Sequence, residues 1–116
     1  MLINDVAKLI EAEFVYDSGT NWDIHSACAC DLMSDVLAFV KEQGLLLTGL
    51  NNPQVIRTAE MMDMKAVVFV RGKEPDPDVV ELAKEKEISL LATDLTMYVC
   101  AGKLYQGGLG CPKKEM

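Results

Sequence analysis

The stretch LLLTGLNNPQVIRTAEMMDMKAVVFVRGKEPDPDVVELAKEKEISLLAT, residues 45–93, decides the fold. Three short apolar runs, residues 45–49, 66–70 and 89–93, alternate with two segments whose apolar residues recur at helical spacing, at a period of about 22 residues. A strand that is apolar on both faces is buried on both faces, as in a parallel sheet covered by helices. The stretch therefore predicts strand–helix units joined by right-handed crossovers.

Helix starts and stops support this division of the chain. Asn52-Pro53 and Asp76-Pro77 each place an N-cap residue before a proline in the first helical position. We also expect Asp94 to cap a last helix, residues 96–106, which Gly107 and Gly108 end.

The first third of the chain is less regular. Apolar residues at helical spacing predict a helix around residues 6–10, and two strands are expected at 13–16 and 23–30, separated by the turn residues 17–21. Asp31 is the expected N-cap of the next helix, and Gly44 its C-terminal stop. The fold class is α/β, a three-layer α/β/α sandwich around a mostly parallel sheet of about five strands. The chain is expected to form a single domain over residues 1–116, with residues 110–116 as a frayed tail.

Composition excludes several classes of partner. The formal net charge is −7, and the few lysines are scattered among acidic residues, which argues against nucleic acid and anionic membrane. No apolar run of 18 residues and no signal peptide are visible, so we expect a cytoplasmic protein with reduced thiols.

Four segments carry a resemblance to a known family: DLMSDVLA, LLLTGLNNPQVIRTAEMM, AVVFVRGKEPDPDVVELAKEKEI and SLLATDLTMYVCAGKLYQGGL. From about Cys30 to Leu109 the chain resembles the DRTGG domain, although the sequence DRTGG itself is absent and Arg71-Gly72 stands where a glycine pair is usual. The family occurs as small free-standing proteins, beside CBS domains in some inorganic pyrophosphatases, and in some phosphotransacetylases. It is similar in fold to the N-terminal domain of HPr kinase/phosphorylase and, more distantly, to that of MurF ligases. The resemblance implies a three-layer α/β domain that regulates or assembles, with no chemistry of its own established.

In open parallel sheets, ligands bind outside the carboxyl ends of the strands. Here that edge is built from TGLNNP, RGKEPDP and TDLT, and the segment DLMSD lies at the end of another strand. Glycine allows close backbone approach, and free N–H groups at a helix start can hold an anion. The candidate ligand-binding residues are Asp31, Ser34, Asp35, Thr48, Gly49, Asn51, Asn52, Arg71, Gly72, Thr93 and Asp94. Capping and tight strand–helix turns explain the same residues structurally.

The stretch HSACACDLMSD, residues 25–35, holds further possible ligands. On a strand, Cys28 and Cys30 point to one face and His25 to the other, and small buried cysteines are common in cores. We expect no metal and no cofactor, because a zinc site would need further ligands from elsewhere in the chain.

The leading hypothesis is a non-catalytic DRTGG-type module that binds a small anionic metabolite, a nucleotide or a protein partner, and that self-associates, a dimer being favoured. Exposed Met61, Met64 or Trp22 would suit a subunit interface, although core packing explains them equally. One alternative is a metal-dependent enzyme acting on a phosphorylated small molecule through Asp31, Asp35 and Asp94. Another is a thiol-based metal or redox sensor using Cys28 and Cys30.

Overall fold

The computed structural model describes residues 1–39 and 44–110. In chain order, its elements are α1 (Ile3–Leu9), β1 (Glu13–Tyr16), β2 (Ala27–Ala29), α2 (Met33–Phe39), β3 (Leu45–Thr48), α3 (Pro53–Met61), β4 (Ala66–Phe69), α4 (Pro77–Lys86), β5 (Ser89–Ala92) and α5 (Met97–Gln106). Among these residues none of the helices is long and apolar enough to cross a membrane.

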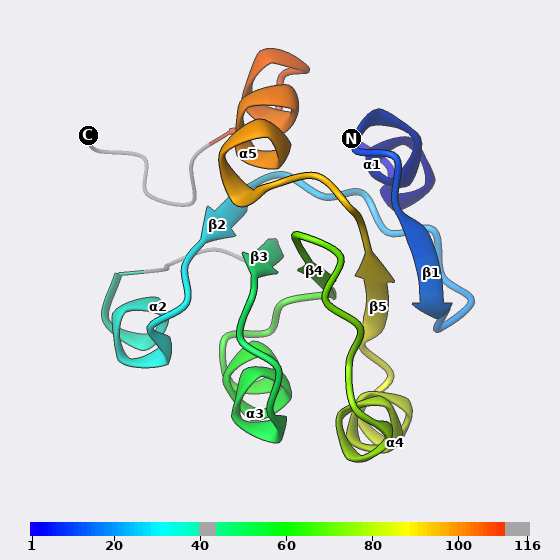
Figure 1. Ribbon diagram of the computed structural model, residues 1–116, viewed down its shortest axis with the longest axis vertical. Coiled ribbons are helices and arrows are strands. Elements are labelled where there is room, and N and C mark those ends of the chain that lie inside the picture. The colour runs from blue at the N-terminus through cyan, green and yellow to red at the C-terminus, as the bar shows by residue number, and fades with distance from the viewer. Residues whose placement is uncertain (40–43, 111–116) are drawn as a thin grey trace.

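The strands form one sheet in the order β1-β5-β4-β3-β2. The strands β2, β3, β4 and β5 are parallel, whereas β1 pairs antiparallel with β5 at the far edge. Each step from β2 to β5 moves one strand across the sheet, so the crossover helices α2, α3 and α4 lie on one face and α1 and α5 on the other (Figure 1). The predicted three-layer α/β fold with a mostly parallel sheet is confirmed.

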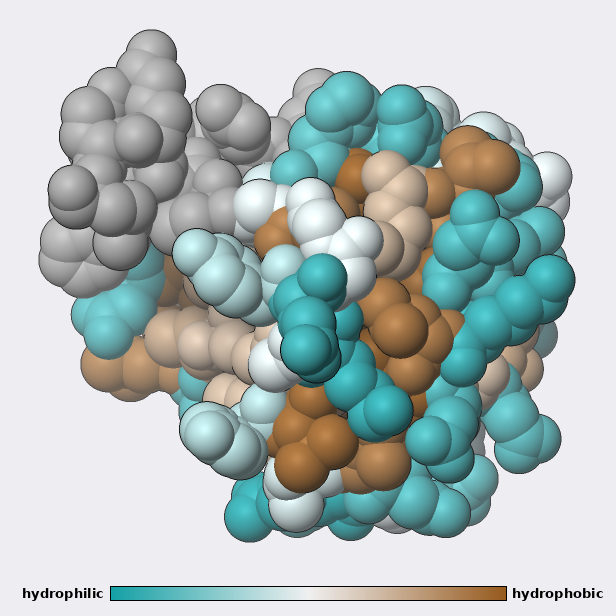
Figure 2. Space-filling view, turned by 90° about the horizontal axis from the view of Figure 1, so that it is seen from above, coloured by the Kyte–Doolittle hydropathy of each residue, from teal (hydrophilic) through white to brown (hydrophobic). Residues whose placement is uncertain are grey.

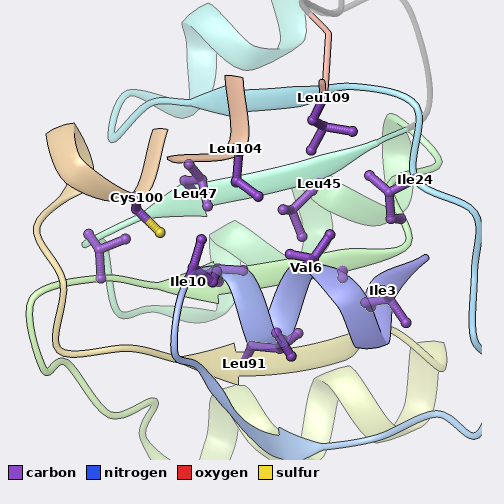
Figure 3. Close-up of a cluster of buried hydrophobic side chains, with 14 residues drawn as sticks. Ile3, Val6, Ile10, Ile24, Leu45, Leu47, Leu91, Cys100, Leu104 and Leu109 are labelled. Carbon is purple, nitrogen blue, oxygen red and sulfur yellow. The ribbon is translucent and has the colours of Figure 1, made fainter. Parts of the chain in front are cut away.

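The two faces of the central strands explain their continuous apolar runs. All four residues of β3 and of β4 are buried. Leu45 and Leu47 contribute to the core under α1 and α5, shown in Figure 3, whereas Leu46 belongs to the core under α2, α3 and α4. The apolar residues that the helices supply to the two cores include Val6, Ile10, Val36, Val55, Ile56, Ala59, Val79, Ala83, Cys100 and Leu104.

Three boundary predictions were wrong. β2 is shorter than residues 23–30, and Asp31 does not cap α2, which begins at Met33. Asp94 does not cap α5 either, because the Thr96 side chain does so, accepting a hydrogen bond from the backbone N–H of Val99 at 3.3 Å. Asn52 is the N-cap of α3, as predicted, and accepts from the N–H of Gln54 at 2.9 Å.

The N-terminal elements and Gly110 pack against the sheet. β1 extends the sheet beside β5, and α1 contributes Ile3, Val6 and Ile10 to the core (Figure 3). Gly110, expected to begin a frayed tail, is bridged to Ser26, and its carbonyl accepts from Ala27 N–H at 3.1 Å. The remainder of that tail, residues 111–116, lies outside the described residues, as does the end of the second predicted helix before Gly44.

Candidate functional site

The carboxyl ends of β2, β3, β4 and β5 lie along one edge of the sheet because these strands are parallel. Each strand is followed by polar or glycine residues that the sequence marks as candidates: Asp31 after β2, Thr48 and Gly49 at the end of β3, Arg71 and Gly72 after β4, and Thr93 and Asp94 after β5. The hydrogen bonds of these residues show which of them are accessible to a ligand and which serve only the fold.

Asp31 ties the end of β2 to the end of β3. Its Oδ1 accepts the backbone N–H of Gly49 at 2.7 Å and the hydroxyl of Thr48 at 2.8 Å. The Thr48 oxygen in turn accepts the N–H of Leu50 at 3.1 Å. Thr48 itself is buried, so its hydroxyl serves the turn, whereas the Asp31 carboxylate is exposed and faces the edge.

These contacts stabilise the ionised form of Asp31. The hydrogen bond from Gly49 N–H is the largest cause that lowers the pKa of this carboxyl below its usual value, and the Thr48 hydroxyl adds to it. The positive charges of Arg71 and Lys73 act in the same direction, while partial burial opposes them. Two cationic side chains therefore lie close enough to Asp31 to act on it electrostatically.

Arg71 has an uncommon backbone conformation. Its φ is 59°, in the left-handed region, and Gly72 follows with a φ of 70°. Two hydrogen bonds to the β5–α5 turn hold this pair: Arg71 N–H to Leu95 O at 2.8 Å and Gly72 N–H to Thr93 O at 2.9 Å. A non-glycine residue in this region is locally strained, as it also is at Glu11, Asp63 and Glu87, and at residue 71 the turn fixes where the arginine side chain leaves the edge.

Gly49 keeps space open between Asp31 and Arg71. A Cβ placed on Gly49 would lie 3.4 Å from Nη2 of Arg71, and 3.8 and 3.9 Å from the two carboxylate oxygens of Asp31. The glycine therefore borders both charged groups, and a side chain there would occupy the space in front of them.

A depression of about 350 Å³ opens beside this pair. It is lined by Asp31, Val70, Arg71, Thr96, Met97 and Tyr98. The first turn of α5 thus forms one wall, and the ends of β2 and β4 form the other. We call it the Arg71 depression.

The other half of the edge has a different character. Asp94 lines a second depression of about 560 Å³, whose other residues are Glu11, Glu13, Phe14, Val15, Gly72, Lys73, Glu74, Ala92 and Thr93. Four acidic side chains against one lysine make it unfavourable for an anion. Thr93 is buried and donates its hydroxyl to Ile10 O at 2.7 Å, so it anchors α1.

The two asparagines have structural partners. Asn51 bridges to the β4–α4 loop, donating from Nδ2 to Glu74 O and accepting from Asp76 N–H, both at 3.0 Å. Asn52 caps α3. They shape the turns of the edge, and a ligand would have to displace these bonds to use the side chains.

Ser34 and Asp35 line neither depression. Both are exposed in the first turn of α2. The expected ligand set is therefore divided: Asp31, Thr48, Gly49 and Arg71 lie together, while Gly72, Thr93 and Asp94 belong to the second depression.

The metal-dependent alternatives find no convergent ligands. Across residues 1–39 and 44–110, no group of three or more histidine, cysteine, aspartate or glutamate side chains is placed to hold a metal ion. Asp31 and Asp94 line different depressions. Cys28 and Cys30 pack against the core under α2, α3 and α4, and exposed His25 lies 3.3 Å from the Asp23 carboxylate.

Sequence reasoning missed the α5 wall of the site. Tyr98 is 88% exposed although it stands in the first turn of an amphipathic helix, and Thr96 and Met97 line the depression beside it. An aromatic residue shortly after the last strand of a parallel sheet was the available signal, because that position also lies at the carboxyl edge.

The model of the DRTGG domain family matches residues 5–106. The chain belongs to the DRTGG domain family. The match begins well before Cys30, where the resemblance read from the sequence started, so α1 and β1 are part of the family domain.

A solved structure has the same fold. It is the crystal structure of the CBS and DRTGG domains of the regulatory region of Clostridium perfringens pyrophosphatase, in complex with the activator diadenosine tetraphosphate. The TM-score is 0.75 at 13% sequence identity, over 90% of this chain and 46% of that chain. This DRTGG domain thus spans less than half the length of that regulatory region. No curated protein matches the chain.

Proposed function

We propose that this DRTGG domain is a non-catalytic regulatory module that binds a small anionic ligand in the Arg71 depression. The observation that carries the proposal is the presentation of Arg71 beside Asp31 and Gly49, on a left-handed turn held by two backbone hydrogen bonds. A guanidinium binds phosphate or carboxylate through paired N–H donors. The neighbouring carboxylate would accept hydrogen bonds from hydroxyl groups of the same ligand.

The structural neighbour supports a regulatory role. It is part of a regulatory region, and its activator is an anionic nucleotide. Regulation by this chain would work as a population shift: a ligand that contacts Arg71 and Asp31 in one arrangement more favourably than in another would favour that arrangement. The molecule acted upon would be a second subunit or a protein partner.

A binding experiment tests the ligand part of the proposal. Isothermal titration and thermal shift with phosphorylated metabolites and nucleotides should reveal a ligand that raises the melting temperature. Arg71→Gln should abolish the shift. Arg57→Gln is the matched control, because Arg57 is exposed on α3 and does not line the Arg71 depression, so this variant should leave the shift unchanged. If Arg71→Gln binds every ligand as the unchanged protein does, the proposed site is wrong.

The proposal includes self-association as a dimer, which small domains often use to gain stability. Of the expected interface residues, Met64 is buried in the core under α2, α3 and α4, and Trp22 packs against the core under α1 and α5, whereas Met61 is 72% exposed. Leu32, directly before α2, and Leu37, within α2, add exposed apolar surface next to α3. Sedimentation equilibrium should give twice the chain mass, and Leu37→Lys should reduce it. A single chain mass at high concentration would contradict this part.

A further inference from the structure

An apolar groove continues from the Arg71 depression along α5. It has a volume of about 440 Å³ and lies between β2 and α5, lined by Ala27, Ala29, Leu47, Tyr98, Ala101, Gly102, Leu104, Tyr105, Leu109 and Gly110. Figure 2 looks onto the α1 and α5 side of the sheet and shows apolar surface exposed between polar side chains. The groove lies within the usual size range of small-ligand sites.

Tyr98 joins the groove to the charged site, because it lines both cavities. Its side chain is 88% exposed, so a face of the phenol ring is available to a ligand. Tyr105, two helical turns further on, is 76% exposed and lines the far end. A tyrosine therefore lies at each end of the groove, and the Arg71 guanidinium lies beyond the end marked by Tyr98.

The side chains that line the groove leave room for a planar group. Ala101 and Gly102 form its wall on α5 between the two tyrosines, and a Cβ added to Gly102 would meet no atom within 4 Å. Among the described residues that line the groove, the tyrosine hydroxyls are the only polar side-chain groups, so a hydrophilic sugar would be poorly accommodated there.

Within residues 1–39 and 44–110, the backbone of β2 adds polar groups at the edge of the sheet. Cys30 N–H points to β3, donating to Leu47 O at 3.0 Å, and Ala27 N–H points the other way, to Gly110 O. Because neighbouring residues of a strand direct their backbone groups to opposite sides, Ala29 directs its N–H and C=O outward at the sheet edge beside the groove. A donor and an acceptor from one residue match the edge of a heterocyclic base.

We propose that the ligand is a nucleoside phosphate, held with its phosphate at Arg71 and its base in the groove between Tyr98 and Tyr105. The inference rests on the proposed function and specifies its ligand class. Charge complementarity with Arg71 decides the orientation, because Arg71 lines the depression that shares Tyr98 with the groove. A second copy pairing with the edge of β2 fits less well, because that strand has three residues and Gly110 already covers its start.

The test compares adenosine 5′-monophosphate, ribose 5-phosphate and inorganic phosphate by isothermal titration. Adenosine 5′-monophosphate should bind at least about tenfold more tightly than ribose 5-phosphate, the advantage expected from stacking one base on an aromatic side chain. Gly102→Leu fills the groove and should remove this advantage while ribose 5-phosphate binds as before. Arg71→Gln should weaken both.

Tyr98→Leu and Tyr98→Phe give an independent readout, because the side chain is exposed and the fold does not depend on it. Leucine should remove the advantage of the base, and phenylalanine should retain it.

Three results would overturn the inference. Equal binding of the nucleotide and ribose 5-phosphate, unchanged by Gly102→Leu, would refute the base site and leave the proposed function standing. Absence of binding by all three probes would count against both. A change of oligomeric mass in Gly102→Leu, without nucleotide binding by the unchanged protein, would assign the groove to a subunit interface.

Discussion

The Thr48 hydroxyl donates to Oδ1 of Asp31 at 2.8 Å and joins the carboxyl ends of β3 and β2. The same carboxylate oxygen accepts Gly49 N–H. These two hydrogen bonds hold the ionised Asp31 carboxylate beside Arg71, and they also hold the start of the loop that follows β3. Stability and ligand binding therefore both depend on Asp31.

Asp31→Asn should change how the free energy of unfolding depends on pH. The folded-state pKa of Asp31 lies below its ordinary value, so ionisation contributes stability above the unfolded-state pKa. That contribution is lost as the pH falls through the lowered folded-state pKa. Asparagine keeps both hydrogen bonds through its oxygen and does not titrate. Urea unfolding should show the original protein more stable near pH 7, with the difference vanishing in acid.

Thr48→Ser is the control for this edge, since it retains the hydroxyl. Thr48→Val should cost roughly 1–3 kcal/mol, because Asp31 and Leu50 N–H each lose a partner. An unfolding difference between the original protein and Asp31→Asn that stays constant from pH 7 to pH 2 would show that ionisation of Asp31 does not stabilise the fold.

Arg71→Gly should raise stability while removing ligand binding. A non-glycine residue in the left-handed region costs roughly 1–2 kcal/mol, and glycine relieves this at the expense of greater freedom in the unfolded chain. We expect a net gain of roughly 0.5–1 kcal/mol by urea unfolding. Arg71→Ala keeps the strain and serves as the comparison for lost side-chain contacts. If glycine is no more stable than alanine at residue 71, the strained turn contributes nothing to the energetics.

The sequence predicts the sheet well and its edge less well, for a physical reason. The buried runs at β3, β4 and β5 have few alternatives, because an apolar segment of that length must be covered on both faces. Asp31 and Asp94 were wrongly expected to cap helices. The Asp31 carboxylate instead bonds across to the end of β3, and the Thr96 side chain, closer to α5 than Asp94, caps that helix. The exposure of Tyr98 depends on where α5 lies over β2, which helical periodicity does not specify.

The caps of α3 and α4 offer a matched pair for a third prediction. Asn52 and Asp76 both precede a proline at the helix start, yet Asn52 accepts a capping hydrogen bond and the Asp76 side chain does not. Asn52→Ala should cost about 1 kcal/mol. Asp76→Ala should cost clearly less, because only its favourable interaction with the helix dipole is lost. Guanidinium unfolding of both variants under one condition makes the comparison; equal losses would show that the capping bond is not the cause.

Gly44 and Gly102 should respond in opposite ways to the same substitution. A Cβ at Gly44 would collide with the carbonyl and hydroxyl of Ser26, where β2 lies against the start of β3, and Leu45 N–H donates to that carbonyl at 3.0 Å. Because both groups are buried and fixed, Gly44→Ala should destabilise by roughly 1–3 kcal/mol. Gly102 stands inside α5 with open space in front of it, so Gly102→Ala should raise stability by up to about 1 kcal/mol through helix propensity. Thermal unfolding of the two variants checks both signs. A loss of stability in Gly102→Ala would mean that the groove is filled in solution, and a neutral Gly44→Ala would mean that β2 can move away from β3 at little cost.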